Sequence, residues 1–238
     1  MAIMRFFESR LNPYPDDDYV LPTNSFLKFL WACTKGLRGW IFLFMFLTAL
    51  TGIYESLLYA WIGQIVDWLG QYSPAELWAQ KGNLLLMMVT VLLLSPVWVG
   101  LASLVHFQTL QGVFPMQMRW RFHRQMLGQS MQFYQDEFSG RVSAKVMQTA
   151  LAVRDTIITI ADMLVYVLVY FVSSGVILAS LDGWLLLPFL GWMVTFVATI
   201  TYFIPKLRDS ASRQADARAL MTGLVTDAYA NITTVKLF

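Results

Sequence analysis

The sequence predicts an all-α membrane protein in which a short helix on the membrane surface precedes four long membrane-spanning helices with polar extensions. Two observations carry this prediction. First, 57% of the 238 residues are hydrophobic and only 13% are charged, which is about half the charged fraction of a typical soluble domain. Second, four stretches are long enough and poor enough in charge to cross about 30 Å of hydrocarbon, which takes roughly 20 residues.

The predicted spans contain very few charged residues. They are residues 39–66, 83–115, 156–181 and 183–205. The first holds Glu55, the third holds Asp162 near its start, and the other two hold no charge at all. Tryptophan residues fall near one end of the spans, as expected for indole rings at a membrane–water interface. These are Trp61, Trp68, Trp78 and Trp184.

Lysine and arginine residues are distributed unevenly between the two sides of these spans. The turns on one side contain a single lysine, Lys81, whereas the segments on the other side are basic. The positive-inside rule assigns the basic side to the cytoplasm. The residues from Met1 to Arg10 lack the apolar core and cleavage site of a signal peptide. We therefore predict a multi-pass protein of a bacterial plasma (inner) membrane, with both ends of this segment cytoplasmic.

The N-terminal 38 residues are predicted to contain a tail and an interfacial helix. Residues 1–22, which include the stretch PYPDDD, form a cytoplasmic tail by composition. The run Pro22-Thr23-Asn24 is a helix-start signal and precedes the sequence SFLKFLWACTKGLRGW. Phe26, Phe29, Leu30 and Cys33 share one face of that helix, and its basic residues point toward the lipid head groups, as in a helix that lies along the inner leaflet.

Polar helical arms are predicted beyond the spans, at residues 116–155 and 206–238. In the first arm, helical character continues to Gln132 and resumes at Val142, which predicts a helical hairpin. Each of its two sides extends about 20–25 Å beyond the bilayer at 1.5 Å per residue. The polar stretch QFYQDEFSGRVSAKVMQ caps it. The second arm has not turned back at Phe238, and we expect the natural chain to continue.

Five residues of the spans are candidates for lining a substrate path: Tyr54, Glu55, Tyr59, Trp98 and His106. A carboxylate about two-thirds of the way across a span is expected to face protein or a water-filled path rather than lipid. A purely structural role for Glu55, hydrogen-bonded between helices, is equally compatible with the sequence. The tyrosines and Trp98 also suit packing or the interfacial belt, and His106 is the lone histidine within a span.

Several chemistries are excluded or disfavoured by the sequence. No G-x-x-x-x-G-K-[ST] loop occurs, so this chain is expected to be no enzyme and to bind no ATP by that route. The single cysteine, Cys33, allows no intramolecular disulfide, and no cofactor or metal motif is present. A net charge of +2 does not suggest a nucleic-acid partner.

Two motifs within the arms resemble those of ATP-binding cassette (ABC) exporters. The first is FYxxxxxGxVxxKV, formed by Phe133, Tyr134, Gly140, Val142, Lys145 and Val146. The second comprises Asn231, Val235, Lys236 and Phe238. The resemblance covers nearly the whole chain and implies the first four of the six helices of an exporter transmembrane domain, preceded by an elbow helix. It also implies that two spans and the nucleotide-binding domain are missing from this segment.

The resemblance assigns the tip of the first arm to a coupling helix that docks on the nucleotide-binding domain. Its residues are Phe133, Tyr134, Gln135, Asp136, Glu137, Phe138, Ser139 and Gly140. In this reading Tyr134 and Phe138 form an apolar knob, and Ser139-Gly140 permits the sharp return. One position departs from the family, since Thr149 stands where an acidic residue is frequent.

The leading functional hypothesis is the membrane-spanning part of an ATP-driven exporter that moves an amphipathic or hydrophobic substrate out of the cytoplasm by alternating access. Its expected partners are the lipid bilayer, a fused or separate nucleotide-binding domain holding ATP and Mg, a second transmembrane domain in a homo- or heterodimer, and the substrate. The alternatives are a signalling or scaffold module that relays to a soluble cytoplasmic domain, and a passive channel-like bundle. A phosphate-binding loop encoded after Phe238 would separate the exporter from both.

Overall fold

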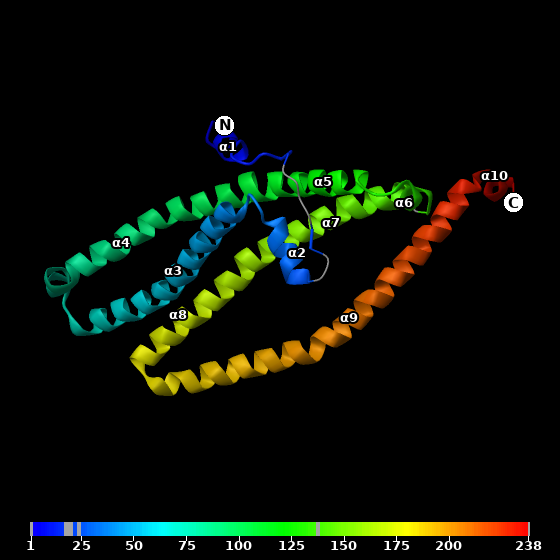
Figure 1. Ribbon diagram of the computed structural model, residues 1–238. Helices are drawn as coiled ribbons and strands as arrows, with labels where there is room; N and C mark the ends of the chain where they lie inside the picture. The colour runs from blue at the N-terminus through cyan, green and yellow to red at the C-terminus, as the bar shows by residue number, and fades with distance from the viewer. Residues whose placement is uncertain (1, 17–20, 23–24, 137–138, 238) are drawn as a thin grey trace. The chain divides into compact units, whose positions relative to one another are not determined.

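The computed structural model describes residues 2–16, 21–22, 25–136 and 139–237. The described residues form helices joined by turns, with no strand among them (Figure 1). Four helical segments are long and apolar enough to cross a membrane. These findings confirm the predicted all-α membrane protein. The chain divides into two compact units, residues 1–177 and 178–238, which are described separately.

The first unit contains most of the helices. They are α1 (Ala2–Glu8), α2 (Phe26–Cys33), α3 (Arg38–Gln71), α4 (Pro74–Leu104), α5 (Gly112–Leu127), α6 (Met131–Asp136), α7 (Ser139–Thr159) and α8 (Val165–Leu181), the last of which continues into the second unit. Two π-helices, η1 (Val105–Gln111) and η2 (Ile160–Leu164), join α4 to α5 and α7 to α8 without a break.

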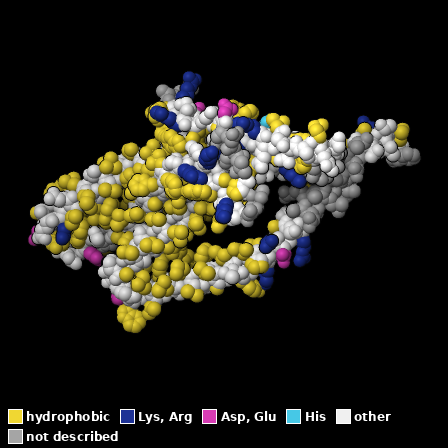
Figure 2. Space-filling view, in the orientation of Figure 1, with side chains coloured by type: hydrophobic (Ala, Val, Ile, Leu, Met, Phe, Trp, Pro, Cys, Tyr) yellow, Lys and Arg dark blue, Asp and Glu magenta, His cyan; other side chains and the backbone are white. Residues whose placement is uncertain are grey.

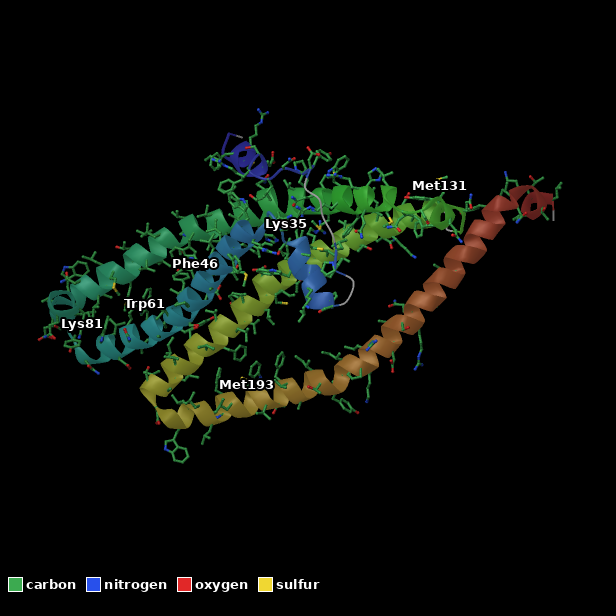
Figure 3. The ribbon with its side chains drawn as sticks, in the orientation of Figure 1. Lys35, Phe46, Trp61, Lys81, Met131 and Met193 are labelled. Carbon is green, nitrogen blue, oxygen red and sulfur yellow. The ribbon has the colours of Figure 1, made fainter. Side chains whose placement is uncertain are left out.

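The second and third predicted spans are parts of much longer helical segments. Residues Pro74–Leu127 form one segment of 54 residues, which is about 80 Å at 1.5 Å per residue. Because the hydrocarbon layer is only about 30 Å thick, much of this segment lies outside it. Figure 3 shows Lys81 at one end of the segment and Met131 just beyond the other. The helical arm predicted from the sequence is therefore confirmed as a continuation of the membrane helices.

The first helix of that segment begins nine residues before the predicted span, at Pro74 rather than at Asn83. Ser73 and Glu76 form a capping box, in which the Ser73 backbone N–H donates to a Glu76 carboxylate oxygen at 3.0 Å. Pro74 suits the first helical position because its missing N–H group would have had no intrahelical partner there. The sequence Ser-Pro-Ala-Glu thus starts the helix well before its apolar part.

The turn between α2 and α3 is held against α5. Gly36 adopts a positive φ of 83°, which glycine tolerates without the steric cost of a Cβ atom. The buried Arg121 donates from its guanidinium to the carbonyl oxygen of Lys35 at 3.1 Å. The predicted interfacial helix is therefore present as α2, and its end is anchored to the arm.

The N-terminal residues also pack on this unit. Within the segment predicted to be a tail, the structure has the helix α1. Phe7 and Leu11 are buried in the main hydrophobic cluster. The Trp120 indole N–H donates to the carbonyl oxygen of Pro15 at 3.1 Å, and Tyr14 packs edge-on against the Trp120 ring. The N-terminal residues therefore pack along α5. Their proline-rich and acidic composition did not predict this packing.

The second unit is a turn followed by one long helix. Asp182 accepts a hydrogen bond from the backbone N–H of Trp184 at 2.9 Å, which starts η3 (Gly183–Leu185). The chain continues as α9 (Leu186–Ala230, 45 residues) and α10 (Ile232–Leu237). Asp182-Gly183 is thus the tight turn that the sequence predicts, and the fourth span and the second arm are one helix.

Apolar side chains dominate the surface over the membrane-spanning helices. Figure 2 shows hydrophobic side chains over α3, α4 and α8, whereas Lys and Arg side chains gather around α2 and α5. Large apolar residues such as Phe46, Leu93 and Val172 are more than 60% exposed. Lipid or further protein must cover such a surface, because soluble proteins rarely expose apolar patches of this extent.

Candidate functional site

A line of polar side chains joins α3 to η2 and α8 within the predicted spans. The Thr48 hydroxyl donates to the Asp162 carboxylate at 3.4 Å. Two turns along α3, the buried Ser56 hydroxyl lies 2.8 Å from that of Ser173 and 3.2 Å from that of Ser174. Hydroxyl groups that bond across helices stabilise helix pairs in membranes, where apolar contacts alone give no preference for one face.

Gly52 lies between these contacts and lets the two helices approach closely. A Cβ atom added there would lie 3.4 Å from both the carbonyl oxygen of Tyr166 and the backbone nitrogen of Tyr170. Thr48, Gly52 and Ser56 are spaced four residues apart and are all buried, so they form one small-residue row on α3. Such rows allow helix backbones to come into contact in membranes.

Glu55 is paired across the same interface. The Tyr166 hydroxyl of α8 donates a hydrogen bond to a Glu55 carboxylate oxygen, and Glu55 is half-buried. The carboxylate therefore faces protein, as the cost of exposing it to lipid requires.

A pocket of about 180 Å³ adjoins this pair. Its walls come from α3, α4, η1, η2 and α8, and it is lined by Phe44, Thr48, Thr51, Val99, Ala102, Ser103, His106, Asp162 and Tyr166. The His106 ring stacks on Phe44 with centroids 5.0 Å apart. The π-helices carry two of its ionisable groups, since His106 lies in η1 and Asp162 in η2. π-Helical turns inside α-helices are frequent at functional sites.

The structure brings some of the five predicted path residues together and not others. His106 lines the pocket. Glu55 does not line it but accepts a hydrogen bond from Tyr166, which does. Tyr54 and Trp98 pack edge-to-face with ring centroids 5.1 Å apart. Tyr59 is 68% exposed and lines none of the described pockets.

Sequence reasoning missed several residues of this region. It noted Asp162 only as a charge in a span, and it did not single out Thr48, Ser56 or Tyr166 as site residues. The spacing of Thr48, Gly52 and Ser56 was the available signal, because small residues four apart mark a contact face. Nothing in the sequence paired that face with Asp162 and Tyr166, which lie more than 100 residues away.

At the far end of the arm, α6 forms a short separate helix after α5 ends. Gly128 follows the last residue of α5, and the Phe133 backbone N–H donates to the Ser130 hydroxyl at 3.2 Å. The Tyr134 hydroxyl donates to the carbonyl oxygen of Met126 at 2.7 Å. This bond ties the tip to the end of α5, while Met131 remains 76% exposed.

The bounds of this tip differ from the predicted coupling helix. Helix α6 begins at Met131, two residues before the predicted start, and Ser139 and Gly140 belong to the first turn of α7 rather than to a turn between helices. The first turn tolerates glycine because its N–H groups lack intrahelical partners in any case. Glu137 and Phe138 lie outside the described residues, so the predicted Phe138 half of the knob is untested.

The spacing of the first exporter-like motif has a packing explanation. Phe133 of α6 lines a pocket of about 270 Å³ together with Val142, Lys145, Val146 and Thr149 of α7. Those four positions repeat as i, i+3, i+4 and i+7, which places them on one helix face. Phe29 of α2 and Phe122 of α5 close the pocket and stack with centroids 6.5 Å apart. The motif therefore joins the tip, both sides of the arm and the α2 helix.

These features define a class of protein: a multi-pass helical membrane domain with long arms that extend past the hydrocarbon layer. Residues 41–238 match the family model of the ABC transporter transmembrane region. The chain belongs to that family, as its motifs suggested.

One relative extends the comparison beyond the membrane part. The chain is 58% identical over 236 residues to an uncharacterized ABC transporter ATP-binding protein of Haemophilus influenzae. The match covers 99% of this chain but only 38% of that relative. No solved structure matches the chain.

Proposed function

We propose that this chain is the membrane-spanning part of an ATP-driven exporter, which moves an amphipathic or hydrophobic substrate out of the cytoplasm by alternating access. The intact protein would hydrolyse ATP with Mg in a nucleotide-binding domain and would act as a dimer of transmembrane domains. Membership of the ABC transporter transmembrane family supports this proposal. So does the name of the relative, which is an ATP-binding protein that extends well beyond the matched segment.

The arm tip is the element that would couple ATP use to the spans. The single observation that carries this step is the continuous helical path from Pro74 to Leu127, with α6 at its end. A rigid helix that reaches from the membrane to a docking partner transmits a displacement of its tip to the span. The tip offers apolar anchors to such a partner, since Leu127, Met131 and Tyr134 are 67%, 76% and 37% exposed.

Replacement of Tyr134 tests this coupling in the full-length protein. Removing a docked aromatic anchor commonly costs about 2 kcal/mol or more, which is more than tenfold in affinity. We expect Tyr134→Ala to retain basal ATP hydrolysis but to lose the ATP-driven change in distance between spin labels attached at Ser73→Cys in the two copies of a dimer. Tyr134→Phe, which removes only the hydrogen bond to Met126, is the matched control and should keep both.

Two outcomes would contradict the proposal. If ATP changes no distance between the Ser73→Cys labels in the otherwise unaltered protein, the alternating-access exporter is wrong. If Tyr134→Ala responds to ATP as strongly as Tyr134→Phe, the arm tip is not the coupling element.

The proposed orientation has its own test. Ser73 and Ser143 are both exposed and lie on opposite sides of the second span. In intact cells, an impermeant maleimide should label Ser73→Cys but not Ser143→Cys, in a background where the buried Cys33 is replaced by alanine. Labelling of Ser143→Cys from outside would place the arm on the wrong side of the membrane.

A further inference from the structure

The pocket between η1 and η2 has more hydrogen-bond acceptors than donors, since the Ser103 hydroxyl and a ring N–H of His106 are the donors left on its lining. Of its four lining hydroxyl groups, those of Thr48, Thr51 and Tyr166 donate elsewhere, to Asp162, to the carbonyl oxygen of Leu47 and to Glu55. Each hydroxyl keeps acceptor lone pairs after donating its one hydrogen. The Asp162 carboxylate adds further acceptor sites, and its hydrogen bond from Thr48 is long, at 3.4 Å. A ligand that supplies several donors therefore suits this pocket.

Among the described residues, His106 is the only basic side chain that lines the pocket beside Asp162, and no lysine or arginine lies near it. Between Gly39 and Pro115 the only lysine or arginine is Lys81, and the third span has neither. Lys81 lies more than three helical turns from Val99, the first α4 residue in the pocket wall. Carboxylates in a membrane interior pair with opposite charge or with hydrogen-bond donors. Glu55 has the Tyr166 hydroxyl as such a donor, whereas Asp162 accepts a hydrogen bond from Thr48 at the long distance of 3.4 Å.

The shape and rim of the pocket restrict the ligand further. A volume of about 180 Å³ exceeds that of a single bound water several times over. One wall is aromatic, because Phe44 and His106 stack there. Val99 and Ser103 on the α4 side of the pocket are exposed, so an apolar group could extend past them. The described residues hold no group of three His, Cys, Asp or Glu that suits a metal ion.

We propose that this pocket binds the protonated amine of an amphipathic ligand, with the ammonium group on Asp162 and the hydroxyl oxygens of Thr48 and Thr51, and with the apolar part leaving past Val99. An ammonium group supplies three donors and no acceptor, which complements the acceptors in the pocket. Its positive charge matches the carboxylate. The role of this ligand as cargo rests on the proposed exporter function, whereas its binding does not.

Equilibrium binding of labelled octylamine to the full-length protein in lipid nanodiscs, without nucleotide, tests this site. Octanol is the neutral control of the same chain length. We expect saturable octylamine binding, no saturable octanol binding, and at least about a tenfold loss of octylamine affinity in Asp162→Asn, since hydrogen bonds to charged groups contribute strongly. Asp67→Asn is the matched control, because Asp67 is exposed on α3 and lies outside the pocket.

A second variant keeps the test decisive if Asp162→Asn does not fold. Thr51→Val removes a pocket hydroxyl that bonds only to its own helix, and it should weaken octylamine binding about threefold or more. Unchanged octylamine affinity in Thr51→Val and in any folded Asp162→Asn would overturn the proposal. Saturable octanol binding of equal affinity would also overturn it, since the pocket would then select only an apolar chain.

The two proposals fail separately. Octylamine binding is measured without ATP and does not depend on the arm tip. If Tyr134→Ala uncouples the protein but octylamine does not bind, only the amine pocket is wrong. If octylamine binds at Asp162 but ATP does not change the distance between the Ser73→Cys labels, only the exporter mechanism is wrong.

Discussion

The contact between α3 and α8 and the contact between α5 and α7 belong to the same unit but are built from opposite chemistry. The first is made by Thr48, Ser56 and Ser173, whose hydroxyl groups bond across the helices, and by the close approach at Gly52. The second belongs to a cluster of buried apolar side chains. These include Met118, Phe122, Ala150 and Val153.

The difference follows from what surrounds each helix pair. Burying apolar surface is favourable only when it leaves water, and the arm carries arginines and other polar residues that require water. Lipid tails are as apolar as leucine side chains, so two spans gain little by burying apolar surface against each other. Small residues and polar bonds therefore decide which helix faces come together. The buried apolar cluster extends from the arm into the spans, where it includes Phe44 and Val105, and the polar bonds are added between the spans.

The largest expected effect is the loss of a buried side chain from the arm. Met118 is fully buried, whereas Met116 on the same helix is 41% exposed. Met118→Ala should cost about 2–5 kcal/mol because it leaves a cavity, while Met116→Ala should cost little. Hydrogen exchange of the α5 and α7 amides in the full-length protein measures the difference, since it reports local opening. Equal protection in the two variants would show that hydrophobic burial does not hold the arm together.

A smaller effect is expected from enlarging the glycine between the spans. Gly52→Leu forces a side chain against the backbone of α8 at Tyr166 and Tyr170, and such overpacking costs about 1–3 kcal/mol. Gly63→Leu on the same helix is the control, because a Cβ atom there has no neighbour within 4 Å. The midpoint of unfolding of the solubilised protein in sodium dodecyl sulfate reports both. If Gly63→Leu destabilises as much as Gly52→Leu, close approach at Gly52 is not what joins these helices.

The smallest effect is expected for a single hydroxyl of the polar contact. Ser56→Ala removes the bonds to Ser173 and Ser174 and should cost about 0.6 kcal/mol, with an upper limit near 1.7 kcal/mol. Ser95→Ala is the control, because the Ser95 hydroxyl donates only to Leu92 of its own helix. The same detergent titration compares the two. A cost for Ser56→Ala above that of Met118→Ala would reverse the comparison between the two contacts.

Runs of apolar residues and the positions of lysine and arginine depend only on local composition, so they can be read without the fold. They predicted four apolar helices with polar extensions, and the structure has four helices long and apolar enough to cross a membrane. Glu55 was predicted to face protein or a water-filled path, because a carboxylate in lipid is costly wherever its helix packs. In the structure it accepts a hydrogen bond from the Tyr166 hydroxyl.

Only the tertiary structure decided which faces of the spans meet. A span that is apolar all round has no hydrophobic face, so periodicity does not show that Gly52 faces α8. The π-helices η1 and η2 were not predicted either, and an extra residue in a turn rotates the following side chains by about 100°. His106 and Asp162 each lie in such a turn and line the same pocket. The proximity of His106 and Asp162 depends on how three helices pack together. The residues next to each of them in the sequence do not contain that information.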